Sequence, residues 1–121
     1  MSAEAALKNC FVSASDDAFL YRIAPDFPAF SGHFPGNPLL PAVCQMGLCA
    51  DALSRRTGRP LEIKAVGRSK FMRPILPGAD VRVMLSPRPD GQFLAELADP
   101  ADGRKFSQII FSARVIEEDI L

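Results

Sequence analysis

The sequence predicts an α+β domain in which one antiparallel sheet wraps around a single long helix. Two observations predict this fold class. One apolar segment, residues 41–57, carries the start and stop signals of a helix, and the segments after it alternate like strands between turn signals. With 121 residues the chain has the length of one domain, so we expect residues 1–121 to share one core.

The first part of the chain is expected to contribute a short helix, one strand and a loop. Residues 3–9 suit a short helix, and residues 18–23 alternate as a strand that Pro25 and Pro28 terminate. The apolar residues on one face of this strand are Phe19, Tyr21 and Ile23. Residues 27–38 are rich in proline and glycine, so we expect a structured loop there.

The long helix is expected over residues 41–57. Pro41 suits the first turn, where its missing N–H is not needed, and Arg55 and Arg56 in the last turn interact favourably with the helix dipole. Gly58 is a natural residue to end the helix. Because the helix is apolar on nearly all sides, other elements must cover it.

The remainder of the chain has the pattern of successive strands. Turn signals separate them, among them Pro89-Asp90-Gly91. The expected strands are residues 61–71, 80–87, 92–98 and 104–115, arranged as a four-stranded antiparallel meander. One sheet curled around one apolar helix is the hotdog architecture. Because a chain of this length buries a modest core, we expect it to form at least a dimer.

Charge and composition exclude several classes of function. The 14 Lys and Arg residues balance 14 Asp and Glu residues, which argues against nucleic-acid binding. One histidine and no paired cysteine motif leave too few ligands for structural zinc. No metal or organic cofactor is implied by the sequence.

The N-terminal residues and the three cysteines indicate the compartment. Residues 1–11 lack the regions of a signal peptide, and no apolar stretch is long enough to cross a bilayer. Cys10, Cys44 and Cys49 are expected to be buried thiols in a reducing environment. We therefore expect a cytoplasmic protein without a membrane segment.

The only histidine lies in the most distinctive stretch of the chain, Gly32-His33-Phe34-Pro35-Gly36-Asn37-Pro38-Leu39-Leu40-Pro41. Proline and glycine restrain the backbone around His33 at the start of the buried helix. An ordinary histidine pKa of about 6.5 suits a general base at neutral pH, so His33 is a candidate base beside an apolar tunnel. The alternative is a loop histidine whose nitrogens bond to the backbone.

Two separated motifs resemble the β-hydroxyacyl-[acyl-carrier-protein] dehydratases of fatty-acid synthesis, the FabZ and FabA type. The stretch around His33 is similar to that family's His-Phe-Pro-Gly, one variable residue, Pro, two apolar residues and Pro-Gly. The second motif, Lys70-Phe71-Met72-Arg73-Pro74-Ile75-Leu76-Pro77-Gly78-Ala79, is similar to the family's Phe-x-Arg-Pro-x-x-Pro-Gly-Asp. The resemblance extends over about residues 18–115.

This resemblance implies the hotdog fold and a dehydration of 3-hydroxyacyl thioesters. It assigns the base to His33 and a close backbone approach to Gly36. It also implies a substrate site that includes Ala42, Val43, Gln45, Gly47 and Phe71. In the family, N–H groups at the helix start stabilise the enolate, and the histidine of one chain meets the acid of the other. The implied partners are an acyl-carrier-protein or coenzyme A thioester and a second hotdog chain, in a homo-oligomer or a heterodimer.

The chain departs from the family at the position of the helix acid, which is Gly47 here. Glycine offers no proton, and it costs a helix roughly 1 kcal/mol relative to alanine. Ala42 stands where the family has glycine. Asp51 lies one turn further along, about 6 Å away, which is too far for a direct replacement. Gln45 can orient a water or a carbonyl, or can bond within a core or an interface; Cys44 near the helix start is a remote candidate for a thiolate.

With glutamine at position 45, the chain also resembles the dehydratase-like subunits of aryl-polyene pathways. Three functions remain open at this point. The chain supplies the His33 half of a site that a partner's acid completes; or it is a hydratase or thioester hydrolase of altered mechanism; or it is a subunit that binds acyl thioesters without catalysis.

Basic residues suggest where an acidic carrier protein docks, although a merely solvated surface is the alternative. One cluster follows the helix, and the other lies on and after the next strand. The clusters are Arg55, Arg56 and Arg59, and Lys64, Arg68, Lys70 and Arg73. Strand alternation predicts that Lys64, Arg68 and Lys70 share a face.

Overall fold

The computed structural model describes residues 3–30 and 38–116, with the side chains of residues 3–5 left aside. The elements in chain order are α1 (Ala3–Asn9), β1 (Phe11–Ser15), β2 (Ala18–Arg22), the short 3-10 helix η1 (Pro28–Phe30), α2 (Ala42–Thr57), β3 (Leu61–Phe71), β4 (Asp80–Pro87), β5 (Phe93–Ala98) and β6 (Lys105–Val115). The predicted helices and later strands are confirmed to within one residue at their ends. β1 was not predicted, because its serines and its exposed residues carry no strand pattern.

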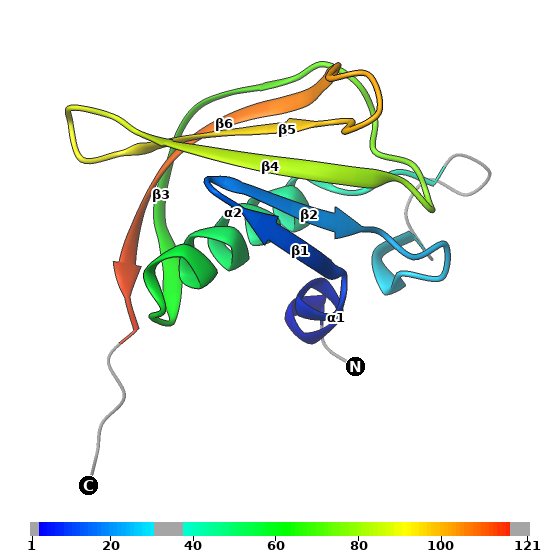
Figure 1. The fold of residues 1–121 in the computed structure, drawn as a ribbon, viewed down its shortest axis with the longest axis horizontal. Helices are drawn as coiled ribbons and strands as arrows, with labels where there is room; N and C mark the ends of the chain where they lie inside the picture. The colour runs from blue at the N-terminus through cyan, green and yellow to red at the C-terminus, as the bar shows by residue number, and fades with distance from the viewer. Residues whose placement is uncertain (1–2, 31–37, 117–121) are drawn as a thin grey trace, which may run out of the picture.

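All described strands join one antiparallel sheet in the order β1-β2-β4-β5-β6-β3. The predicted four-stranded meander is therefore wrong at one strand: β4, β5 and β6 form a meander, but β3 pairs with β6 at the far edge (Figure 1). The segment 72–79 crosses the sheet instead of making a hairpin. The N–H groups of Met72 and Arg73 donate to the Phe106 carbonyl at one end, and the Ile23 N–H donates to the Ala79 carbonyl at the other.

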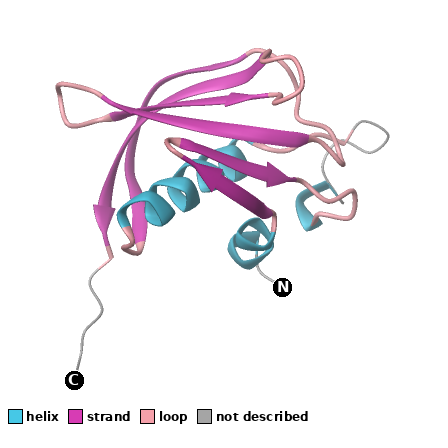
Figure 2. Ribbon diagram, in the orientation of Figure 1, coloured by secondary structure: helices cyan, strands magenta, loops and turns pink. Residues whose placement is uncertain are grey.

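The sheet curls over α2, as the two ribbon views show (Figures 1 and 2). Leu48, Cys49 and Ala52 on α2 are fully buried in the same core as Tyr21 and Phe111 of the sheet. This packing confirms the hotdog prediction. Pro41 is the N-cap residue, and Gly58 ends the helix at φ 72° with its N–H on the Ser54 carbonyl.

The sheet covers only one side of α2. On the other side Val43 is 72% exposed, and Met46, Gly47 and Ala50 are partly exposed. These residues recur at helical spacing, so they form one face. The expectation that other elements cover the helix all round therefore fails on this face, which we call the open face of α2.

β3 is an edge strand with two irregularities. Its register with β6 shifts between Ile63 and Ala65 and again between Val66 and Ser69. Each shift interrupts the simple alternation of side chains. The prediction that Lys64, Arg68 and Lys70 share a face rests on strict alternation, and β3 does not keep it.

Candidate active site

A cavity of about 590 Å³ lies against the open face of α2. Its walls come from α1, α2, the start of β3 and the residue after β6. Most of the lining is apolar, from Leu7, Val43, Met46, Gly47, Ala50, Pro60, Leu61, Ile63 and Ile116. Polar groups lie on α1, on and just after the C-terminal part of α2, and on β3: Lys8, Asp51, Ser54, Arg55, Arg59 and Glu62. The cavity can therefore accommodate an apolar chain.

Gly47 lies in this cavity wall, and α1 covers it. A Cβ atom at position 47 would lie 2.5 Å from Cδ1 of Leu7, closer than carbon atoms approach in a folded protein. Leu7 is 5% exposed. Leu7 thus fills the space into which a side chain at position 47 would extend, and an acid there requires Leu7 to move.

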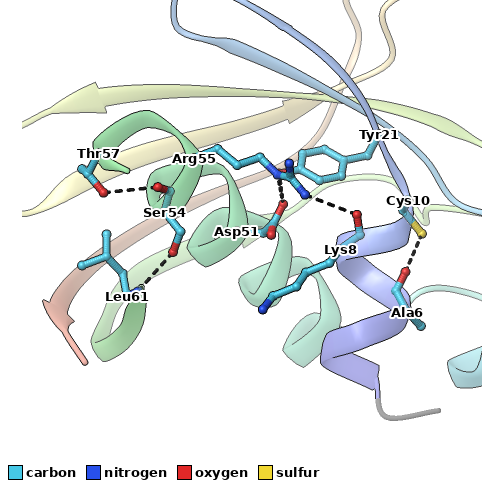
Figure 3. A network of polar contacts seen from close by, with 9 residues as sticks. All are labelled: Ala6, Lys8, Cys10, Tyr21, Asp51, Ser54, Arg55, Thr57 and Leu61. Carbon is cyan, nitrogen blue, oxygen red and sulfur yellow. Dashed lines mark hydrogen bonds and ion pairs between the residues drawn. The ribbon is translucent and has the colours of Figure 1, made fainter. Parts of the chain in front are cut away.

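Asp51 is engaged by two donors, one turn beyond Gly47 (Figure 3). Tyr21 donates its hydroxyl to Oδ2 at 2.7 Å, and Arg55 donates its Nε to the same oxygen at 2.7 Å. The Asp51 side chain is 9% exposed and Tyr21 is fully buried. Burial, and after it the hydrogen bond to Asp51, raises the pKa of Tyr21 far above its ordinary value. Asp51 is therefore an acceptor in a polar cluster rather than a free proton donor.

Gln45 points into the core and not into the cavity. The Ser107 hydroxyl donates to its Oε1 at 2.7 Å, and its Nε2 donates to the Leu40 carbonyl at 3.3 Å. Gln45 is 4% exposed. These contacts match the interpretation of Gln45 as a residue that bonds within the core, and not the one in which it orients a water or a carbonyl.

Phe71 lies at the end of β3, opposite Ser107. Residues directly opposite in an antiparallel pair point to the same face, so Phe71 is on the α2 side of the sheet. It is 47% exposed, and the described lining of the cavity does not include it.

The start of α2 places Ala42 and Val43 at the surface. The N–H groups of Cys44 and Gln45 donate to the Pro41 carbonyl. The N–H groups of Ala42 and Val43, the first two of the helix, have no acceptor carbonyl within α2. The Leu40 N–H donates to the Ile75 carbonyl at 2.8 Å, which fixes the approach to the helix. His33 and Gly36 lie outside the described residues.

The cysteines do not form a reactive site. Cys10, Cys44 and Cys49 are free and buried. Burial raises the pKa of the Cys44 thiol, and it raises the pKa of Cys49 to about 12. A thiolate at Cys44 is therefore disfavoured, which removes the remote nucleophile considered from the sequence.

Leu7 is the residue of this site that the sequence did not indicate. It is a plain apolar residue in a short helix, and nothing in the local pattern connects it with position 47. In the part of the chain that the structure describes, no cluster of His, Cys, Asp and Glu suits a metal ion. None of the described helices is long and apolar enough to span a membrane.

The family model of the ApeI-like dehydratases, described as ApeI dehydratase, matches residues 12–110. The chain belongs to this family. FabZ, the 3-hydroxyacyl-[acyl-carrier-protein] dehydratase of Haemophilus influenzae (strain PittEE), is 36% identical over 65 residues, 47% of this chain and 44% of the relative. FabZ of Brucella ovis is 39% identical over 59 residues, 42% of this chain and 38% of the relative. The chain thus spans less than half the length of these curated relatives.

Two solved structures have the same fold as this chain. An uncharacterised protein from Erwinia carotovora superposes with a TM-score of 0.63 at 26% identity, covering 88% of this chain and 92% of that one. The dehydratase heterocomplex ApeI:P from Xenorhabdus doucetiae gives a TM-score of 0.66 at 19% identity, covering 85% and 92%. At the latter identity the likeness concerns the fold alone.

Proposed function

We propose that this ApeI-like chain is a subunit of a 3-hydroxyacyl-thioester dehydratase that contributes His33 as the base and takes the acid from a partner chain. The observation that carries the proposal is the pair Gly47 and Leu7. The family's acid position has no side chain, and an apolar side chain fills the adjoining space. The nearby Asp51 already accepts two hydrogen bonds.

The proposed reaction removes water from a 3-hydroxyacyl thioester. His33 takes the proton from C2, and the electron pair of that C–H bond moves toward the thioester carbonyl as an enolate. N–H groups at the start of α2 stabilise the enolate oxygen, where the helix dipole is positive. The electrons then return to form the C2–C3 double bond while the C3 hydroxyl leaves with the acid's proton as water.

Two surfaces support a partner of the same fold. β3 is an edge strand of 11 residues, so its outer backbone groups are available for pairing with a strand of another chain. The open face of α2 lies beside the start of β3, since both line the cavity. A heterocomplex is what the Xenorhabdus ApeI:P structure contains, and we extend that arrangement to this chain.

An acyl-carrier-protein thioester is the substrate we propose, by analogy with the FabZ relatives. A coenzyme A thioester shares the phosphate and the thioester, so it serves as a model substrate in assays.

The proposal is tested by building the missing acid into the chain. We compare hydration of crotonyl-coenzyme A, the reverse reaction, by Gly47→Glu and by Leu7→Ala/Gly47→Glu, because the second removes the side chain that a residue at position 47 would meet. We expect the double variant to gain activity at least tenfold over Gly47→Glu, since one general acid contributes roughly 100-fold or more.

The matched control adds His33→Ala to the double variant, and we expect this change to remove the gain. A folded double variant that stays inactive, or one whose gain survives His33→Ala, contradicts the proposed roles. Circular dichroism and thermal unfolding establish that each variant is folded.

A further inference from the structure

α1 packs across α2 at the position where the catalytic family carries its acid. The family match begins at residue 12, so α1 and Leu7 lie outside it. The Leu7 side chain lines the cavity, and so does Gly47. Leu7 is therefore a wall of the cavity that comes from α1, outside the range that the family model matches.

An arginine fixes α1 in this place (Figure 3). Arg55 donates from Nη2 to the Lys8 carbonyl at 3.3 Å, in the last turn of α1, where carbonyls lack helical partners. The guanidinium also lies 3.7 Å from the centre of the Phe11 ring, just after α1. Asp51 orients Arg55 through the 2.7 Å contact described above. α1 is thus held to α2 by polar contacts at its end and by Leu7 against Gly47.

We propose that Leu7 is a specificity-determining residue that sets how long or bulky an acyl chain the cavity accepts. This rests on the proposed function in that it assumes an acyl thioester at the start of α2. A chain that runs from Val43 along the open face passes Gly47, where the Leu7 methyl groups occupy the space beside it. Removal of those methyl groups lengthens or widens the path.

Binding of unreactive substrate analogues tests this role without turnover. The probes are S-butyl, S-octyl and S-dodecyl coenzyme A thioethers, with Kd measured by calorimetry for wild type and Leu7→Ala. Each methylene that enters apolar surroundings changes Kd about fourfold. We expect Leu7→Ala to improve the dodecyl-to-butyl affinity ratio about fifteenfold, because two further methylenes find room.

Two further variants complete the experiment. Leu7→Val, which keeps most of the packing, is expected to shift the ratio in the same direction by a smaller factor, and it serves if Leu7→Ala does not fold. Val12→Ala removes a 51% exposed apolar side chain from β1 outside the cavity lining, and we expect it to leave the ratio unchanged.

The outcomes separate this proposal from the proposed function. A ratio within twofold of wild type in both Leu7 variants overturns the specificity role, whatever the chain catalyses. A shifted ratio, together with a failed acid-insertion experiment, supports the role of Leu7 and contradicts the proposed dehydratase subunit. A wild-type chain that binds none of the probes contradicts both.

Discussion

The two faces of α2 differ in what holds them in place. The sheet-facing side buries Cys44, Gln45, Leu48 and Cys49 against the strands. The open face presents Val43, Met46, Gly47 and Ala50 to the cavity, and α1 covers it at Gly47. The first face is fixed by packing, whereas the second keeps small or exposed residues that packing alone does not require. We infer that the open face is kept for a ligand or a partner.

The polar groups on the two faces differ in the same way. Gln45 on the sheet side bonds wholly within the core, to Ser107 and Leu40. Asp51, where the two faces meet, bonds to buried Tyr21 on one side and to half-exposed Arg55 on the other. A core polar group serves the fold, while Asp51 links the core to the element that covers the cavity.

The largest expected difference comes from truncating one residue on each face. Leu48→Ala should lower the free energy of unfolding by about 2–5 kcal/mol, because Leu48 is fully buried. Val43→Ala should change it by less than about 0.5 kcal/mol, because Val43 is 72% exposed. Urea unfolding of the two variants checks this. Equal losses would mean that the open face is covered in solution by the chain itself or by a second copy.

Tyr21→Phe tests the polar contact at the place where the two faces of α2 meet. It removes one donor from Asp51, and we expect a loss of about 1.5–3 kcal/mol, the range for a hydrogen bond to a charged group. Arg55 remains as the partner of Asp51 in this variant. Chemical denaturation measures the loss, and an unchanged stability would show that the Tyr21 hydroxyl contributes nothing to the cluster.

The pH dependence of the same contact has a definite sign. The pKa of Tyr21 is raised in the folded chain. The contribution of its hydroxyl to the free energy of unfolding is therefore fully present below a pH of about 10, where Tyr21 also keeps its proton in the unfolded chain. It is lost as pH rises from there toward the folded pKa. The chain has one tyrosine and no tryptophan, so ultraviolet absorbance follows this group alone. Ionisation at the ordinary tyrosine pKa in the folded protein would contradict the buried contact.

The smallest expected effect concerns Gly47 and Leu7. In a Leu7→Ala background, Gly47→Ala should stabilise the chain by up to about 1 kcal/mol, because alanine favours the helix and its methyl enters free space. In the wild-type background the same change should give no gain, since the new methyl meets Leu7. A double-mutant cycle measures the coupling between the two positions. Strict additivity would mean that the two residues do not touch.

Local sequence patterns predict much of the fold. Pro41 and Gly58 mark the ends of α2, and alternation marks β4 because its inward residues Val81 and Val83 are fully buried. Such signals involve residues close in the chain. The place of β3 at the far edge depends on pairing with β6, for instance Leu61 with Val115, which no local signal encodes.

The site is less predictable than the fold. The resemblance to the dehydratase family identifies Gly47 as the position where the acid is missing. The structure adds that Gly47 lies in the cavity wall. The residue that fills its space, Leu7, comes from a separate helix, and contact between distant segments has no sequence pattern of its own. The core position of Gln45 is hard to predict for the same reason, because its hydrogen-bond partner Ser107 lies on the last strand, far away in the sequence.

The proposed half-site at His33 is tested most directly with the purified wild-type chain alone. Hydration of crotonyl-coenzyme A is followed by loss of enoyl absorbance, with His33→Ala measured beside it. We predict that wild type is no faster than His33→Ala, because the chain lacks an acid at position 47. Turnover by wild type that disappears in His33→Ala would contradict it, since the chain would then hold a complete site of its own.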